Sequence, residues 1–163
     1  MSDQSEQSIG GNEQPSYLDW NNSIDVLDKA FENGLFVLII GPKGTGKTSL
    51  AKKGIANVLK DSDGNTRPFA FIAVGGSSNA STLEGHSYTY VGSTWGKIVD
   101  ILIETKCMNP IIYIDELDKV SKTEHGKELI GILIHMTDPS QNDSFIDKYF
   151  SGIKIDISKC LII

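Results

Sequence analysis

The sequence lacks the features that direct a chain into a membrane or across one. No apolar run approaches the roughly 20 residues of a membrane span, and the N-terminus has no apolar signal-peptide core. Cysteine is scarce as well: Cys107 and Cys160 lie in different segments without C-x-x-C spacing, which argues against a metal or redox motif and predicts free thiols. We therefore expect an intracellular protein, in the cytoplasm or an organelle matrix, with no membrane partner.

Positive charge is also in short supply. The chain has 15 lysines and arginines against 21 acidic residues, and its net charge of −6 argues against a strongly nucleic-acid-binding surface. The histidines, His86, His125 and His135, share no metal-ligand spacing, and we assign them no catalytic role. A length of 163 residues, with 39% hydrophobic and 22% charged side chains, predicts one globular domain with a sizeable core.

The sequence does contain a phosphate-binding loop pattern. Residues 41–48 read Gly-Pro-Lys-Gly-Thr-Gly-Lys-Thr and fit G-x-x-x-x-G-K-[ST] at every fixed position. Before it, residues 35–40 form an uninterrupted apolar run typical of a buried parallel strand; after it, residues 48–59 carry apolar side chains at helical spacing. A glycine-rich turn that precedes Lys-Thr by chance is the alternative, but the flanking strand and helix favour a nucleoside triphosphate site.

The chemistry of this loop follows from its residue types. Glycines let the backbone wrap round an anion so that successive N–H groups point at phosphates, and the helix start adds its positive dipole end. We expect Lys47 to reach the β- and γ-phosphates and the hydroxyl of Thr48 to bind Mg²⁺. The predicted cofactor-binding residues are Gly41, Pro42, Lys43, Gly44, Thr45, Gly46, Lys47, Thr48 and Ser49.

A second motif lies downstream, where the apolar run 111–114 leads into Asp115 and Glu116. A strand covered on both faces can present an acid only at its end, where the strand emerges beside the phosphate loop. We expect Asp115 to hold Mg²⁺ and Glu116 to orient or deprotonate the attacking water. Strands also end in solvated acids without a function, but the phosphate loop upstream favours the functional interpretation.

The rest of the chain divides into short segments around these motifs. Residues 1–16 have the polar composition of a disordered leader, and residues 17–34 are predicted as a lead-in region with an amphipathic helix. An aromatic segment between glycines, 85–92, is predicted as a mobile projecting loop. The other expected elements are strands at 69–74, at 153–156 and from 160 onward, helices at 78–83, 94–106 and 124–136, and an amphipathic turn or helix at 145–150.

With these residues in view, the sequence from about residue 36 to residue 163 resembles the ATPase module of the Lon-type ATP-dependent proteases, which belong to the AAA+ class. The resemblance extends beyond the two nucleotide motifs that all AAA+ proteins share. The further matching runs are Gly75-Gly76, Glu84-Gly85-His86, Thr89-Tyr90-Val91-Gly92, Asp115-Glu116-Leu117-Asp118-Lys119-Val120, Asp138-Pro139 and Ser158-Lys159. The chain departs from the family at Lys43, where proline is usual, and at Ser87-Tyr88, where an arginine pair is usual.

The resemblance implies an α/β fold of the P-loop NTPase kind. It would be the AAA+ large subdomain, a three-layer α/β/α arrangement with a parallel sheet, formed by residues 35–163 and incomplete at its C-terminal end. The implied cofactors are ATP and Mg²⁺. Lys47 and Glu116 would be catalytic, and Thr48 and Asp115 would bind the metal ion.

The resemblance also implies a larger machine. In the full-length protein the module would assemble into a ring, a hexamer by this resemblance, that hydrolyses ATP at subunit interfaces and pulls unfolded protein substrates through a pore. Tyr90 and Val91 would be the pore-loop pair that grips these substrates. The family's arginine finger, helical lid and Ser-Lys protease domain have no counterpart in these residues, so we expect this chain to be an ATPase that does not itself encode the peptidase.

Two alternatives stay open at this point. The first is a nucleotide-binding switch or remnant with little turnover, and the second is a nucleic-acid-directed AAA+ ATPase of the clamp-loader or helicase type. The acidic net charge and the Tyr90-Val91 loop stand against nucleic acid as a partner.

Overall fold

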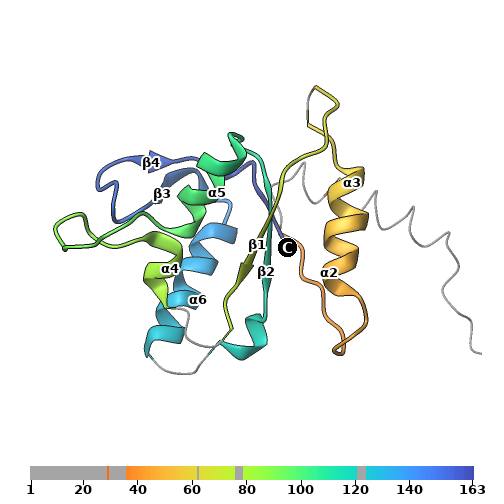
Figure 1. The fold of residues 1–163 in the computed structure, drawn as a ribbon, viewed down its shortest axis with the longest axis horizontal. Helices are drawn as coiled ribbons and strands as arrows, with labels where there is room; N and C mark the ends of the chain where they lie inside the picture. Colours follow the sequence, from red (N-terminus) through yellow and green to blue (C-terminus); the bar gives the residue numbers. More distant parts are fainter. Residues whose placement is uncertain (1–28, 30–35, 62, 76–78, 121–123) are drawn as a thin grey trace, which may run out of the picture.

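A small parallel β-sheet lies at the centre of the protein (Figure 1). The structure, a computed structural model, describes residues 29, 36–61, 63–75, 79–120 and 124–163. The sheet has the strand order β1-β2-β5, and its strands are β1 (Phe69–Ala73), β2 (Ile111–Asp115) and β5 (Leu161–Ile162). The sheet confirms the predicted α/β class and the predicted strands at 69–74 and 111–114.

The register of the sheet brings the ends of its strands together. Phe69 pairs with Ile111 at one end of β1, and Ala73 pairs with Asp115 at the other, while Ile111 also pairs with Leu161. Both pairings are parallel, so the carboxyl ends of the strands lie at the same edge of the sheet, the edge at which open α/β sheets bind ligands. Asp115 therefore lies at the ligand-binding edge.

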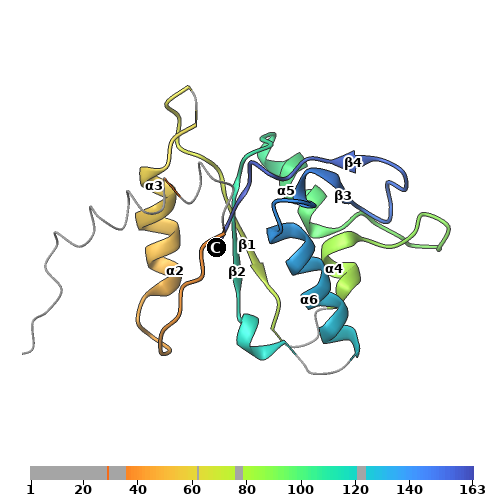
Figure 2. The same ribbon diagram turned by 180° about the vertical axis from the view of Figure 1, so that it is seen from behind.

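Helices cover both faces of the sheet and form the predicted three-layer arrangement (Figures 1 and 2). On one face lies the helical segment after the phosphate loop, which consists of α2 (Lys47–Ser49), a π-helical stretch (Leu50–Ile55) and α3 (Ala56–Val58). On the other face lie α4 (Ala80–Glu84), α5 (Lys97–Thr105) and α6 (Glu124–Thr137). The helix predicted at 124–136 is confirmed as α6.

Each face of the sheet has its own hydrophobic core because successive residues of a strand point to opposite faces. Beneath α4, α5 and α6 the core contains Ile72, Leu83, Ile98, Ile112, Leu129 and Met136. Beneath the helical segment after the phosphate loop the core contains Ala51, Ile55, Ala56, Leu59, Ile111, Tyr113 and Leu161. Neighbouring residues of β2 thus anchor both helical layers to the sheet.

The helix after the phosphate loop differs from its prediction in its middle turns. The sequence predicts a continuous α-helix over 48–59, but Leu50–Ile55 is π-helical, and the N–H of Ala56 donates to the carbonyl of Ala51. Bonding from residue i to residue i+5 widens the turn. As a result Ala51 and Ala56 are both buried, at 0% and 3% exposure, where an α-helix would turn one of them away from the sheet.

The predicted strand at 35–40 is wrong in its pairing and in its burial. Residues 36–40 form no strand, although the N–H of Val37 donates to the carbonyl of Ile162 at 2.9 Å. Val37 and Ile39 pack against the core beneath the following helix, whereas Phe36, Leu38 and Ile40 are 52%, 62% and 85% exposed. An apolar run predicts burial on both faces, but nothing within the described ranges covers the second face of this segment.

Segments in the second half of the chain show further differences. Trp95, predicted within a helix over 94–106, precedes α5 and stacks on Phe150 with ring centroids 6.1 Å apart. The amphipathic turn or helix predicted at 145–150 contains instead the short strand β3 (Phe145–Ile146), paired antiparallel with β4 (Lys154–Ile155). Phe145 is buried in the core. A two-residue strand needs only this one apolar side chain to pack against the core, so the segment does not need apolar residues at helical spacing.

The chain's one arginine, Arg67, is a structural residue. It is 2% exposed, and its Nε donates to the carbonyl of Asn109 at 2.6 Å while its guanidinium also donates to the carbonyl of Lys159 at 2.8 Å. Burial lowers the pKa of this guanidinium. Arg67 thus joins the residues that precede β1, β2 and β5.

Other predictions fall outside the described residues or are left untested. The leader at 1–16 lies outside them, as does the lead-in region at 17–34 apart from Lys29. Within the part of the chain that the structure describes, no helix combines the length and the apolar character that crossing a bilayer requires.

Candidate functional site

The phosphate loop forms a compact turn ahead of α2. Gly44 and Gly46 both have a φ of +80°, a backbone conformation that side-chain-bearing residues rarely adopt. The hydroxyl of Thr45 donates to the carbonyl of Pro42 at 2.8 Å, and the N–H of Leu50 donates to the carbonyl of Gly46 at 2.8 Å. The glycines are therefore required by the path of the loop, as the sequence pattern predicts.

Lys47, the first residue of α2, folds back over this loop. Its ammonium donates to the carbonyls of Gly41 and Pro42 at 2.7 and 2.8 Å. Three donors on a flexible stem let an ammonium exchange such partners for the oxygens of an anion. The predicted phosphate-binding cation is thus held at the loop that would bind the phosphates.

Thr48 has a partner that sequence reasoning missed. Its hydroxyl lies 3.4 Å from the hydroxyl of Tyr113 in the middle of β2, within hydrogen-bonding reach. Tyr113 is 4% exposed, and its ring stacks on Phe69 and Phe71 with centroids 6.1 and 5.8 Å apart. A tyrosine inside an otherwise aliphatic strand was the available signal, because a buried phenol needs a partner for its hydroxyl.

Asp115 and Glu116 lie at the carboxyl end of β2, as predicted. The N–H of Glu116 donates to a carboxylate oxygen of Asp115 at 2.9 Å, and the N–H of Val74 donates to the carbonyl of Asp115 at 3.1 Å. The second bond fixes the backbone of Asp115 to the residue that follows β1. The Asp115 side chain is half-buried and lines the same cleft as the phosphate loop.

Glu116 has a strained backbone, with a φ of 62° and a ψ of 31°. A left-handed conformation is uncommon for a residue with a long side chain, and such outliers concentrate at functional sites. The carboxylate of Glu116 forms an ion pair with Lys119, and this hydrogen bond raises the pKa of Lys119. Lys119 was not among the predicted site residues, although its spacing of three from Glu116 permits the contact.

One cleft brings the predicted residues together. It has a volume of about 1110 Å³, and its polar part is lined by Gly41, Lys43, Gly44, Gly46, Lys47, Thr48, Ser49, Asp115, Glu116, Asp118 and Lys119. The apolar part is lined by side chains that include Phe36, Leu38, Ile40, Ile130 and Ile134. Of the predicted cofactor-binding residues, only Pro42 and Thr45 do not line the cleft.

The oxygen donors of this cleft suit magnesium. No group of three or more His, Cys, Asp or Glu side chains in the described ranges is arranged to hold a metal ion by itself. Magnesium prefers oxygen ligands and is usually held by one or two protein groups together with waters and substrate phosphates. The hydroxyl of Thr48 and the carboxylate of Asp115 therefore fit Mg²⁺ in the presence of a nucleotide.

Tyr90 and Val91 lie apart from this cleft, on a loop between α4 and α5 that projects from the body of the protein (Figure 1). They are 70% and 107% exposed. The loop turns through bonds from the N–H of Tyr90 to the carbonyl of Ser87 and from the N–H of Ser93 to the carbonyl of Tyr90, both 3.1 Å. The projection agrees with the sequence, while the mobility of the loop stays a prediction.

Comparison with known proteins agrees with the site. The model of the ATPase family associated with various cellular activities (AAA) matches residues 37–162. The Lon protease of Campylobacter concisus is 42% identical over 131 residues, which are 80% of this chain and 15% of that protein. The Lon protease homolog, mitochondrial 1, of Dictyostelium discoideum is 44% identical over 135 residues, which are 83% of this chain and 13% of that protein.

These relatives are much longer than the sequence described here. The Lon protease of Chlamydia pneumoniae, 37% identical over 141 residues, is matched over 86% of this chain and 16% of its own length. The chain thus spans between 13% and 16% of the length of these three relatives. The phosphate loop, the acid pair at the end of β2 and the parallel sheet between helices agree with the family match: the chain belongs to the AAA family of ATPases, as a domain homologous to the ATPase module of the Lon proteases.

Proposed function

We propose that this domain binds ATP with Mg²⁺ and hydrolyses it in the cleft between the phosphate loop and the end of β2. The observation that supports the proposal is the convergence of Lys47, Thr48, Asp115 and Glu116 on this one cleft. The polar part of the cleft suits a triphosphate, and the apolar side chains along the rest of it suit a base and ribose.

Each of these residues has a part that follows from its chemistry. The backbone N–H groups of the loop and the ammonium of Lys47 bind the phosphates. Thr48 and Asp115 hold Mg²⁺, which neutralises charge on the phosphates. Tyr113 orients the hydroxyl of Thr48 through the 3.4 Å contact between their oxygens.

Glu116 acts on the water that attacks. The water oxygen forms a bond to the γ-phosphorus, the bond from that phosphorus to the bridging oxygen of ADP breaks, and Glu116 accepts the proton that the water loses. The ion pair with Lys119 orients the carboxylate from the side of the following turn. The strained backbone of Glu116 sets the direction in which its side chain leaves the main chain.

We further propose that the natural protein carrying this domain works as a ring, a hexamer by its resemblance to Lon, that unfolds and translocates protein substrates. The relatives at about 40% identity are named Lon proteases, which supports an ATP-driven action on polypeptides. Tyr90 and Val91 present an exposed aromatic and an exposed aliphatic side chain, and such apolar surface grips a polypeptide without demanding a sequence.

The experiment compares Glu116→Gln with Glu104→Gln, which removes an exposed acid on α5 that does not line the cleft. Nucleotide binding is measured by titration with a fluorescent ATP analogue, and turnover is measured by phosphate release, both in the natural protein that contains these residues. We expect Glu116→Gln to bind as the wild type does and to lose roughly 10²–10⁴-fold in turnover, the usual contribution of a general base.

The outcomes separate the alternatives. Equal losses of binding and turnover in Glu116→Gln would contradict its role as the base. A wild-type protein that binds ATP but releases no phosphate, with or without an unfolded polypeptide, would be a nucleotide-binding switch. Stimulation of turnover by DNA in a salt-dependent manner would favour a nucleic-acid-directed ATPase.

A further inference from the structure

The loop that carries Tyr90 and Val91 begins and ends at one point. A Cβ on Gly85 would lie 2.7 Å from the backbone nitrogen of Gly96, and a Cβ on Gly96 would lie 2.5 Å from the backbone nitrogen of Gly85. Just inside this crossing, the N–H of His86 donates to the carbonyl of Thr94 at 3.0 Å. Residues 85–96 therefore form a closed loop. We call the close approach of Gly85 and Gly96 at its base the neck, and this neck requires glycine on both sides.

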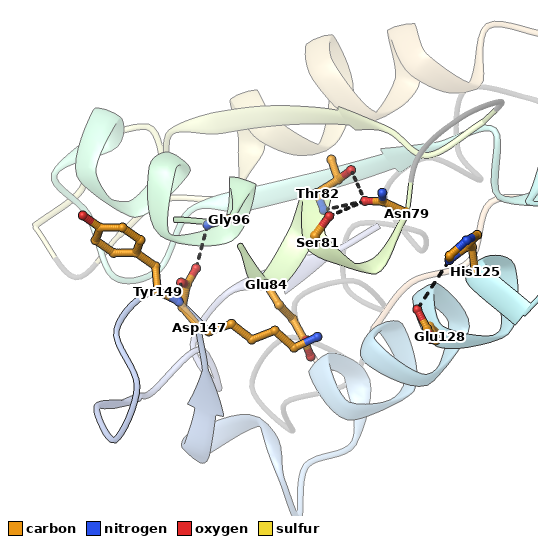
Figure 3. A network of polar contacts seen from close by, with 10 residues as sticks. Asn79, Ser81, Thr82, Glu84, Gly96, His125, Glu128, Asp147 and Tyr149 are labelled. Atoms are coloured by element: carbon orange, nitrogen blue, oxygen red, sulfur yellow. Dashed lines mark hydrogen bonds and ion pairs between the residues drawn. The ribbon is translucent and has the colours of Figure 1, made fainter. Parts of the chain in front are cut away.

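A buried carboxylate from another segment lies at this neck. Asp147 is 0% exposed, one of its oxygens accepts the N–H of Gly96 at 2.7 Å, and the other accepts the N–H of Tyr149 at 2.8 Å. Figure 3 shows Asp147 below the start of α5, with the bond to Gly96 drawn. The same carboxylate also lies close to the other side of the neck, since a Cβ on Gly85 would lie 2.9 Å from its Oδ1 atom.

The carboxylate of Asp147 lies at the start of α5, where it accepts the N–H of the N-cap residue Gly96. Gly96 is the N-cap of α5 and has no side chain with which to accept the free N–H groups of the first turn. A residue with a side chain does not fit there, since a Cβ on Gly96 would lie 2.0 Å from the carbonyl oxygen of Leu83. Asp147 supplies a negative charge from outside the helix, at the end where the helix dipole favours it.

A second contact ties the same segment to the incoming side of the loop. The N–H of Lys148 donates to the carbonyl of Glu84 at 2.7 Å, and the two side chains form an ion pair at 2.9 Å. Glu84 is the last residue of α4, immediately before the loop. The ring of Trp95, on the outgoing side, packs edge-on against Tyr149 with centroids 5.9 Å apart. Residues 147–149 thus hold both sides of the neck.

The outer part of the loop has no such support. In the described part of the chain, the hydrogen bonds of residues 87–93 are all made within the loop itself. The direction in which Tyr90 and Val91 project is therefore set at the neck. We propose that Asp147 is a positioning residue that fixes this neck and so determines how Tyr90 and Val91 are presented to a polypeptide; the polypeptide itself rests on the function proposed above.

The first experiment tests the anchoring alone by amide hydrogen exchange in Asp147→Asn and Asp147→Ala. Asparagine keeps one acceptor and places an amide NH₂ against the other backbone N–H, whereas alanine removes both acceptors. We expect exchange at Gly96 and His86 to quicken at least tenfold in Asp147→Ala and by less in Asp147→Asn. The core amides of Ile114 and Ile163, which bond to Ile163 and Ile112 in the sheet, should not change. Asp143→Asn, an exposed acid on the preceding turn, is the matched control and should leave all four amides unchanged.

The second experiment tests the presentation of the loop in the natural protein. ATP turnover is measured with and without reduced carboxymethylated α-lactalbumin, an unfolded polypeptide, and Tyr90→Ala sets the scale of the expected effect. In Asp147→Asn we expect turnover without polypeptide to stay within twofold of wild type, while the KM for the polypeptide rises at least threefold. Asp143→Asn should leave both values unchanged.

Three results would overturn the inference. Exchange that quickens equally at the neck and in the sheet would make Asp147 a general stabiliser of the fold. Unchanged exchange at Gly96 would show that the neck does not depend on Asp147. A loosened neck with an unchanged KM would show that its geometry does not govern the grip. If the wild type does not respond to the polypeptide at all, the function proposed for the loop fails, and the exchange data still decide the anchoring.

Discussion

Glu116 leaves no room for a side chain at residue 75. A Cβ on Gly75 would lie 2.4 Å from the Oε2 atom of Glu116 and 2.9 Å from its Cβ. Gly75 follows β1, so the neighbouring strand limits the position of the proposed base on one side, while Lys119 holds it on the other. The position of the Glu116 side chain thus depends on residue 75 having no Cβ.

Gly75→Ala should therefore lower turnover more than it lowers nucleotide affinity. The added methyl group forces Glu116 to shift, and a misplacement of about 1 Å can cost roughly 100-fold in rate. We expect phosphate release to fall at least tenfold, with ATP affinity within threefold of wild type. Gly131→Ala adds a methyl group in open space on α6 and serves as the control. An unchanged rate in Gly75→Ala would contradict the placement of Glu116 as the base.

Lys47→Ala should weaken nucleotide binding itself. A hydrogen bond to a charged group contributes about 1.5–3 kcal/mol, so we expect ATP affinity to fall roughly 10- to 100-fold by titration with a fluorescent analogue. Lys53→Ala removes an exposed lysine from the helical segment that follows and should leave affinity within twofold. Equal effects of the two variants would mean that net charge, and not the contact made by Lys47, governs binding.

Two glycine substitutions should change stability in opposite directions. In Gly96→Ala the methyl group meets the Leu83 carbonyl oxygen, and we expect the free energy of unfolding in urea to fall by about 3 kcal/mol or more. In Gly131→Ala the methyl group meets nothing within 4 Å on an exposed face of α6, so the free energy of unfolding should rise by about 0.5–1 kcal/mol. Tolerance of Gly96→Ala would contradict the close crossing at the neck.

Cys160 should resist alkylation in the folded protein. Burial raises the pKa of its thiol from 9.0 to about 12, so at pH 8 its reactive thiolate is about 1000-fold rarer than in the unfolded chain. Mass spectrometry after iodoacetamide treatment of a Cys107→Ser variant, with and without guanidinium chloride, measures this ratio. Because the unfolded chain loses this proton at lower pH than the native protein does, Cys160 should also lower stability as pH rises from 9 towards 12. Rapid labelling of the folded variant would contradict the burial.

The core of the candidate site could be predicted because local sequence determines it. The spacing from Gly41 to Thr48 specifies a turn ahead of a helix, and an apolar run that ends in Asp115 can present an acid only at the edge of the sheet. The family match and the cleft agree with these predictions, while the roles of Lys47, Thr48, Asp115 and Glu116 stay proposals.

Other residues of the site could not be predicted because they depend on contacts between distant segments. Gly75 is separated from Glu116 by α4, α5 and β2, and only the parallel register of β1 and β2 brings them together. Tyr113 in an aliphatic strand signals a hydroxyl that needs a partner, but only the fold shows that this partner is Thr48. Asp147 lies in a segment predicted as an amphipathic turn or helix, where the structure has β3 followed by a turn, and nothing in the sequence signals its bond to Gly96.

The three-layer arrangement of the fold was predictable from the sequence, whereas the segment before the phosphate loop and the π-helical turns after it were not. Apolar patterning located α6 by its helical periodicity and β2 by its uninterrupted run, since both elements bury these side chains. It failed for residues 36–40, where an apolar run does not reveal how much of it a partner will cover, and in the π-helical turns that bury both Ala51 and Ala56.

Because Gly85 and Gly96 lie so close together, the residues between them can be replaced by another loop. Because the chain leaves and re-enters the domain at one point, a substitute of different length would leave α4 and α5 where they are, and each doubling of its length would cost only about 0.6 kcal/mol in closure entropy. None of these residues lines the nucleotide cleft. The residues that this loop presents can therefore change, by evolution or by design, without a change in the residues that line the cleft.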